Sequence, residues 1–382
     1  MTETLKISRP DIAGMNYDRL ETAFRVLARE VEEGVIPGAV AAIGRRGHIA
    51  GFRVYGWAQL YGSRRLMQMD TLFDLASLTK VVATLPCVLR FIEQGLVRLD
   101  DPVKIVLPEF SGEGRDEITI RHLLTHTAGL PAHRKFYEEN LAGDQIIREL
   151  FRVVPEAPPG ARVVYSDLGF MLLGLIVEKL SRTDLASHAR KHIFEPLGMK
   201  DTTFRPVDVP GLLERAAATE LRKDLDRVIV GDVHDENAYA LGGVAGHAGL
   251  FSTASDLCIY CQMILNCGRY GNSRVLSPAA VLASMALQTP PGDPQPRGLG
   301  WLRLPASHSA AGDFLSPATV YHTGFTGTSL HIDPVNDLFI VLLTNRVHPT
   351  RQNEAITRIR PRFCNAVAAS IEDWGGGHAG NQ

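Results

Sequence analysis

The chain has 382 residues, of which 45% are hydrophobic and 21% are charged, and its formal net charge at pH 7 is −2. This composition excludes a disordered protein, and the near-neutral charge provides no basic surface for nucleic acid. No run approaches the roughly 18 apolar residues of a membrane-spanning helix. Residues 1–14 lack the apolar segment of a signal peptide, so we expect a cytoplasmic protein that binds neither nucleic acid nor membranes.

The chain contains five cysteines, and this odd number also favours free thiols in a reducing compartment. Cys258 and Cys261 form a Cys-x-x-Cys pair, which is compatible with a metal or redox site. The surrounding residues also fit a helix that uses cysteine as a small apolar residue. Because no second ligand pair occurs at metal spacing, we favour the helix and expect no metal site.

The first elements alternate between helix and strand. Residues 17–33 carry apolar side chains at helical spacing and predict an amphipathic helix. Two β-rich runs in residues 38–58 flank a turn at residues 45–47, which indicates a hairpin. Residues 80–290 are then mostly helical, with loops rich in proline and glycine.

The C-terminal part returns to strands. A loop-rich stretch at residues 288–301 marks the boundary. Residues 321–334 and 337–346 read as two strands joined by a turn, and residues 359–374 form a closing helix. Residues 375–382 read as a frayed tail.

This order predicts an α+β fold in which the N- and C-terminal segments build one antiparallel sheet flanked by helices. Residues 1–75 and 295–382 would form this lobe, and residues 76–294 a mainly helical lobe inserted into it. Such a cleft between lobes is a usual place for an active site.

The strongest catalytic signal is the Ser-x-x-K pattern of Ser77 and Lys80 at the start of an apolar helix, which Pro86 should kink. Residues three apart share one helix face, and a serine hydroxyl becomes nucleophilic when a neighbour accepts its proton. A helix start with a capping serine and a solvated lysine would give the same pattern. No other serine in the chain has a lysine three residues later.

A second motif is Tyr165-Ser166-Asp167, which precedes an apolar helix starting near Leu168. The Tyr165 phenol becomes a competent base if a cation such as Lys80 stabilises its phenolate. Alternatively, Tyr165 is a packing residue and Asp167 the N-cap of the helix.

A third motif begins at His322-Thr323-Gly324. Glycine in a strand often marks a close approach of backbone to a ligand. Acyl transfer requires two N–H donors on one oxygen, and our candidates are the backbone N–H groups of Ser77 and Phe325. His322 would donate a hydrogen bond to the substrate or to Tyr165, although a glycine-rich turn with an exposed histidine would look similar.

Together the three motifs resemble those of the serine β-lactamase and penicillin-binding-protein superfamily, especially its class C and esterase-like branch. Supporting segments include IRHLLTHTAGLP at residues 120–131 and GLFSTASDL at residues 249–257. The resemblance implies a β-lactamase/transpeptidase-like fold. It also implies an acylated Ser77, Lys80 as its activating partner, Tyr165 as general base and acid, and no metal or organic cofactor.

Two departures bear on the substrate. Class C β-lactamases have asparagine where this chain has Asp167, and lysine where it has His322. Loss of that lysine should weaken recognition of a β-lactam carboxylate. We therefore expect a small-molecule ester or amide substrate, with esterase activity favoured and His322, Thr323, Gly324 and Asp167 among the substrate-binding residues.

Three alternatives remain open: a muropeptide amidase or D-amino-acid peptidase, a β-lactamase, and a slowly acylated penicillin-binding sensor. The segment 233–249 resembles a subgroup that includes muropeptide amidases. Its His234, Asp235 and His247 fit substrate contact, a structural role or, less well, a metal, and we select His234 as a substrate-binding candidate.

Overall fold

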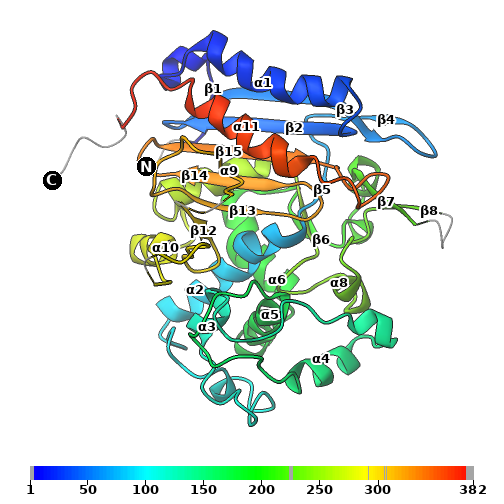
Figure 1. Ribbon diagram of the computed structural model, residues 1–382, viewed down its shortest axis with the longest axis vertical. Helices are drawn as coiled ribbons and strands as arrows, with labels where there is room; N and C mark the ends of the chain where they lie inside the picture. The colour runs from blue at the N-terminus through cyan, green and yellow to red at the C-terminus, as the bar shows by residue number, and fades with distance from the viewer. Residues whose placement is uncertain (1–3, 223–226, 291, 305, 307, 376–382) are drawn as a thin grey trace.

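A computed structural model describes residues 4–222, 227–290, 292–304, 306 and 308–375. Its main sheet combines strands from both ends of the chain (Figure 1). In spatial order these are β1 (Lys6–Ile7), β3 (His48–Gln59), β2 (Gly38–Arg45), β15 (Leu338–Thr344), β14 (Ser329–Asp333), β13 (Val320–Thr323) and β12 (Leu302–Arg303), with β4 (Arg65–Leu66) paired to β3.

The sheet is mixed, which corrects the predicted antiparallel one. β1 runs parallel to β3, whereas the other pairs are antiparallel. An intervening helix and strand separate β1 from β3, and a parallel pairing requires a long connection of this kind. The predicted hairpin is confirmed, since β2 and β3 meet at the pair Arg45 and His48.

Both faces of the sheet are buried. Figure 1 shows α1 (Tyr17–Glu32) and α11 (Ile356–Ala368) over one face and α9 (Ala254–Leu265) against the other. Successive side chains of β2 point to opposite faces of the sheet. Ala41 belongs to the core under α1 and α11, whereas Ala42 belongs to the core that includes α9. α9 therefore packs on the sheet, although its residues fall in the segment predicted as the helical lobe.

The remaining helices and strands lie outside the main sheet. The helices are α2 (Leu85–Glu93), α3 (Ile120–Leu124), α4 (Asp144–Phe151), α5 (Asp167–Ser181), α6 (Leu185–Ala189), α7 (Glu195–Leu197), α8 (Glu236–Ala240) and α10 (Pro278–Met285). The small sheets are β5 (Phe73–Asp74) with β9 (Leu250–Ser252) and β6 (Thr203–Phe204), β7 (Ala218–Arg222) with β8 (Arg227–Val230), and β10 (Arg269–Tyr270) with β11 (Ser273–Arg274).

Two predicted elements take a different form. The single strand predicted for residues 321–334 is two strands, β13 and β14, because a tight turn at residues 324–328 reverses the chain between them. The turn closes with the Gly324 N–H donating to the Thr328 carbonyl at 2.8 Å, and Gly327 adopts a φ of 112° that favours glycine.

The irregularity expected at Pro86 begins before it. Lys80–Thr84 forms a π-helical turn, and Pro86 lies in the first turn of the following α2, where its missing N–H is tolerated. The closing helix starts and ends earlier than predicted, at Ile356 and Ala368, and the frayed tail predicted from residue 375 lies outside the described residues from 376 onward. Across the described ranges, no helix is both long and apolar enough to cross a membrane.

Candidate active site

Ser77 lies on a sharp turn directly after β5. Its neighbour Ala76 has a φ of 46°, a left-handed conformation that residues other than glycine seldom adopt. The buried carboxylate of Asp74 supports this turn by accepting the Ala76 N–H at 2.8 Å and the His234 N–H at 2.7 Å. Burial raises the pKa of Asp74, although both N–H donors oppose the rise. Asp74 is a positioning residue that the motif search missed.

Lys80 is fully buried, and its three N–H donors meet three acceptors. Nζ lies 2.9 Å from Ser77 Oγ, 2.7 Å from Asp167 Oδ1 and 3.0 Å from the carbonyl oxygen of His247. Burial lowers the pKa of Lys80, but Asp167 and Tyr165 outweigh burial and raise it overall. Lys80 is therefore an ammonium ion at neutral pH, and Ser77 Oγ accepts a hydrogen bond from it.

Asp167 is not the N-cap of α5, which corrects the prediction. Ser166 occupies that position, and Asp167 is the first helical residue, with its carboxylate turned toward Lys80. Its second oxygen lies 3.5 Å from His133 Nδ1. Burial would raise the pKa of Asp167, yet Lys80 and His133 hold it below its usual range, so the group is a carboxylate. It neutralises the charge of Lys80.

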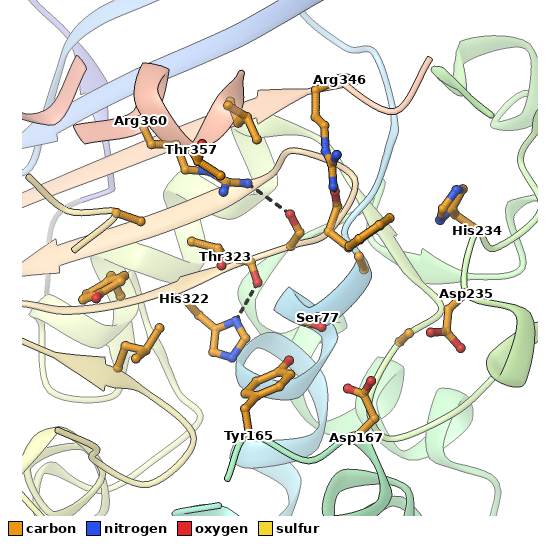
Figure 2. A pocket seen from close by; sticks show the side chains of 18 of the residues that line it. Ser77, Tyr165, Asp167, His234, Asp235, His322, Thr323, Arg346, Thr357 and Arg360 are labelled. Atoms are coloured by element: carbon orange, nitrogen blue, oxygen red, sulfur yellow. Dashed lines mark hydrogen bonds between the residues drawn. The ribbon is translucent and has the colours of Figure 1, made fainter. Parts of the chain in front are cut away.

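The Tyr165 ring is enclosed by charged and aromatic groups. Its centroid lies 4.9 Å from Lys80 Nζ, 4.5 Å from the ring centroid of His126 and 6.0 Å from that of His322. Figure 2 shows the Tyr165 hydroxyl on the side of Ser77. Burial raises the pKa of Tyr165, while Lys80 and Ser77 act in the opposite direction. The structure thus brings Ser77, Lys80 and Tyr165 together.

The turn between β13 and β14 is tied to the backbone just before Ser77. Thr326 Oγ1 donates to the Asp74 carbonyl at 2.7 Å, and Thr328 Oγ1 donates to the Leu75 carbonyl at 3.0 Å. A Cβ atom on Gly324 would lie 2.4 Å from the Leu75 carbonyl oxygen, so only glycine fits. Both threonines were missed, because the sequence suggested one continuous strand.

Phe325 lies in this turn with a half-exposed ring. Its carbonyl oxygen accepts a hydrogen bond from Arg346 Nε at 2.8 Å, and the Arg346 guanidinium covers the ring at 4.5 Å. Among the described residues, no acceptor pairs with the Phe325 N–H. The peptide is therefore anchored at its oxygen and has an N–H left over for a ligand.

His322 is buried, and its Nδ1–H donates to the Thr323 carbonyl oxygen at 2.9 Å (Figure 2). Burial, together with Lys80 and Arg297, lowers the pKa of His322 to about 3, so the ring is neutral at pH 7. The neutral ring then carries its lone pair on Nε2, which has no partner in the described part of the chain. In this tautomer the buried Nε2 is a hydrogen-bond acceptor, which differs from the predicted donor role.

The segment 233–249 has mainly structural contacts. His234 Nε2 lies 3.2 Å from Glu220 Oε2, and its ring stacks on Phe325 at 5.7 Å. Asp235 caps α8 and lies 2.9 Å from His247 Nε2. Within the described ranges, no group of three or more histidine, cysteine or acidic residues is arranged to hold a metal ion.

The predicted helix around Cys258 and Cys261 is confirmed. Both residues lie in α9 with free thiols, and burial raises their pKa.

A cavity of about 780 Å³ opens beside Ser77. Tyr165, Asp167, His234 and the predicted third motif, residues 322–324, line it. Figure 2 shows these side chains converging from both lobes, with Asp235 and His234 on the side away from His322. The cavity therefore contains the predicted substrate-binding residues on two opposite walls.

Buried arginines form a further part of this cavity. Five arginines of the described residues are buried, and two of them, Arg45 and Arg115, pair with carboxylates. The other three, Arg297, Arg346 and Arg360, all line the cavity, and none has a carboxylate within 4 Å in the described part of the chain. No motif predicted these three arginines, because they lie in a loop, after a strand and in the closing helix.

Known proteins are similar to this chain in sequence and in fold. The family model described as Beta-lactamase matches residues 23–361. A curated relative from Salmonella agona (strain SL483), named "Putative D-alanyl-D-alanine carboxypeptidase", is 32% identical, and the alignment covers 92% of this chain and 88% of the relative.

Two solved structures are similar over nearly their full length. EstCE1, a hydrolase with promiscuous acyltransferase activity, is 25% identical with a TM-score of 0.73, covering 92% of this chain and 99% of EstCE1. A penicillin-binding protein homologue from Pyrococcus abyssi is 22% identical with a TM-score of 0.72, covering 93% of this chain and 78% of the homologue. The match of the family model over most of the chain, together with these similarities, confirms the predicted superfamily and fold: the chain belongs to the beta-lactamase family.

Proposed function

We propose that this protein is a serine hydrolase that cleaves small carboxylic esters or amides through an acyl-Ser77 intermediate. The observation that carries the proposal is the arrangement of Lys80, whose three donors are all engaged, one of them by Ser77 Oγ. An ammonium ion in this state holds the serine in place and has no lone pair for its proton. The proton of Ser77 therefore passes to the phenolate form of Tyr165.

The acylation step can be written from these groups. Ser77 Oγ attacks the substrate carbonyl carbon while Tyr165 takes the hydroxyl proton, and the carbonyl oxygen becomes an oxyanion. The backbone N–H groups of Ser77 and Phe325 are the proposed donors to that oxygen. Tyr165 then returns the proton to the leaving alcohol or amine. Water repeats the sequence on the acyl-enzyme, with Tyr165 again as base and then as acid.

Esterase activity remains the favoured assignment. Activated short-chain esters need only a nucleophile and an oxyanion hole, because their leaving group departs without strong acid assistance. The similarity to EstCE1, a hydrolase with promiscuous acyltransferase activity, supports this choice. A cytoplasmic location stays part of the proposal, and the five free cysteines support it.

The second candidate is a carboxypeptidase acting on peptides that end in a free carboxylate. The observation in its favour is the positive charge of Arg346 and Arg360 on the cavity wall, which no carboxylate of the described residues balances. Arg360 Nη2 donates to the carbonyls of Gly324 and Thr328 at 3.0 and 2.9 Å, beside the third motif. In this candidate function, the two arginines bind the substrate carboxylate in place of the lysine that the third motif lacks. The name of the Salmonella relative agrees with this candidate.

A substrate panel tests the proposal. We would measure turnover of p-nitrophenyl acetate, of an N-acylated D-alanyl-D-alanine dipeptide, of a muramyl peptide and of nitrocefin, with Ser77→Ala as control. Ester turnover that Ser77→Ala abolishes, without release of D-alanine, supports the esterase. Release of D-alanine moves the assignment to the carboxypeptidase, and cleavage of the muramyl peptide or of nitrocefin moves it to the amidase or the β-lactamase. A stoichiometric burst without turnover of any substrate would refute the hydrolase in favour of a slowly acylated sensor.

A further inference from the structure

The charge balance around Tyr165 is unusual. Lys80 and Asp167 lie 2.7 Å apart and form a net neutral pair next to the ring. His126 and His322 also face the ring, and burial lowers the pKa of both well below 6.5, so both are neutral at pH 7. These four groups supply no net positive charge to a Tyr165 phenolate. The resemblance noted above would place asparagine at 167 and lysine at 322, which together leave the site two charges more positive.

One cation remains. The guanidinium carbon of Arg297 lies 5.6 Å from the centroid of the Tyr165 ring, and its side chain is 2% exposed. Nε and Nη1 have no hydrogen-bond partner among the described residues and no contact with solvent, while Nη2 lies 3.2 Å from Gln295 Oε1. A buried, unpaired cation is strongly unfavourable unless negative charge develops near it.

The backbone fixes this guanidinium in place. The Arg297 N–H donates to Thr289 Oγ1 at 3.0 Å, and the Arg297 carbonyl accepts the Gln288 N–H at 2.7 Å. The loop that carries Arg297 is therefore braced, and the guanidinium lies over the Tyr165 ring. Because Nε and Nη1 are shielded from solvent, a substrate in the cavity cannot reach them without displacing protein atoms. Arg297 differs in this respect from a residue that binds a ligand directly.

We propose that Arg297 is a positioning residue of the acylation step, which acts through Tyr165 by supplying the net positive charge that its phenolate requires. The inference rests on the proposed function, because it needs Tyr165 to accept the Ser77 proton. No bond to Arg297 forms or breaks, and the proton moves only between Ser77, Tyr165 and the leaving group.

The expected size follows from the geometry. A unit charge 5.6 Å away shifts a pKa by about two units at an effective dielectric constant of about 20. Relaxation of the site reduces this, so we expect a shift of about one unit or more. Below the pKa of Tyr165 the acylation rate follows the phenolate fraction, and one unit is then a tenfold change in rate.

The experiment compares Arg297→Met and Arg297→Lys with a matched control, Arg303→Met. Arg303 is a half-buried arginine on the nearby strand β12, and its Nε, like that of Arg297, has no partner among the described residues. The burst rate with p-nitrophenyl acetate is recorded from pH 5 to pH 10 over a range of ester concentrations, together with the melting temperature. We expect Arg297→Met to move the alkaline rise of the burst rate up by about one pH unit and to slow acylation at pH 7 about tenfold. The dissociation constant of this neutral ester, taken from the concentration dependence of the burst rate, should stay constant; Arg297→Lys should keep most of the burst rate, and Arg303→Met should match the wild type.

Several outcomes would overturn the inference. A folded Arg297→Met with the wild-type pH profile, a shift of equal size in Arg303→Met, or a change confined to the dissociation constant of the ester with an unchanged maximal burst rate would each refute it. If Arg297→Met does not fold, Arg297→Gln takes its place, and a Gln profile that coincides with the Lys profile refutes the inference. Absence of any burst in the wild type would refute the proposed function itself, whereas a normal wild-type burst with an unmoved variant refutes only the role of Arg297.

Discussion

The two threonine hydroxyls that tie the turn at residues 324–328 to the nucleophile offer a sharp test of how the site is assembled. Thr326 and Thr328 are buried and donate to the carbonyls of Asp74 and Leu75. The double variant Thr326→Val/Thr328→Val removes both hydrogen bonds while conserving side-chain shape. A buried hydrogen bond contributes about 1 kcal/mol net, so the double variant should lose about 2 kcal/mol of folding free energy.

The two readouts should respond very differently. Unfolding entropy near 2.1 cal/mol/K per residue converts about 2 kcal/mol into a fall of only about 2–3 °C in the melting temperature of a chain this long. The catalytic loss should be larger, because a displaced Phe325 N–H removes one oxyanion donor, which costs about 100-fold to 1000-fold in kcat when complete. We therefore expect kcat with p-nitrophenyl acetate to fall at least tenfold.

The matched control is Thr319→Val. Thr319 is equally buried, but its Oγ1 has no partner among the described residues, so its removal should change neither the melting temperature nor kcat. The assay is thermal unfolding alongside steady-state ester hydrolysis for both variants. A double variant that loses stability while keeping kcat within twofold would refute the reasoning that these hydroxyls position the oxyanion donor. An equal loss in Thr319→Val would show a general packing effect instead.

Three further predictions concern charge and proton transfer. Tyr165→Phe should lower the burst rate at pH 7 by about 100-fold to 10,000-fold, the usual contribution of a positioned general base, and a burst rate within tenfold of the wild type would remove the tyrosine from proton transfer. Asp167→Asn should lower the melting temperature, because it leaves Lys80 buried without its counter-ion. The same variant should shift the pH profile of acylation to lower pH, since the Asp167 charge raises the pKa of Tyr165. An unmoved pH profile would contradict this prediction. Burial lowers the pKa of His331 to about 3 against about 6.5 in the unfolded chain, so the folded state should lose stability as the pH falls from 6.5 toward 3. His331→Leu should flatten that loss in urea titrations at pH 7 and pH 5, and an unchanged difference between the two pH values would contradict the prediction.

Local motifs in the sequence predicted much of the site, since Ser77 and Lys80 share one helical turn and their contact depends on short-range geometry. The three motifs together also suggested that Lys80 lies beside Tyr165, whereas the pairing of Lys80 with Asp167, which spans 87 positions, was not predicted. The two β-rich runs on either side of a tight turn likewise predicted the hairpin of β2 and β3.

Longer-range features could not be predicted from periodicity. The break at Gly324 depends on contact with Leu75, and the tie from Thr328 depends on the same carbonyl. Arg297 lies in a loop whose path is set by hydrogen bonds to residues 288 and 289. Its position behind Tyr165 is a property of the folded chain, so a single sequence shows only an arginine in a loop rich in proline and glycine.

The central claim is that Ser77 carries the acyl group. Intact-mass spectrometry of the wild type mixed for milliseconds to seconds with p-nitrophenyl acetate, followed by peptide mapping, measures this directly. We expect a transient acetyl adduct on the peptide that contains Ser77, its decay as acetate is released, and no adduct in Ser77→Ala. Turnover without that adduct, or an equal adduct in Ser77→Ala, would contradict it.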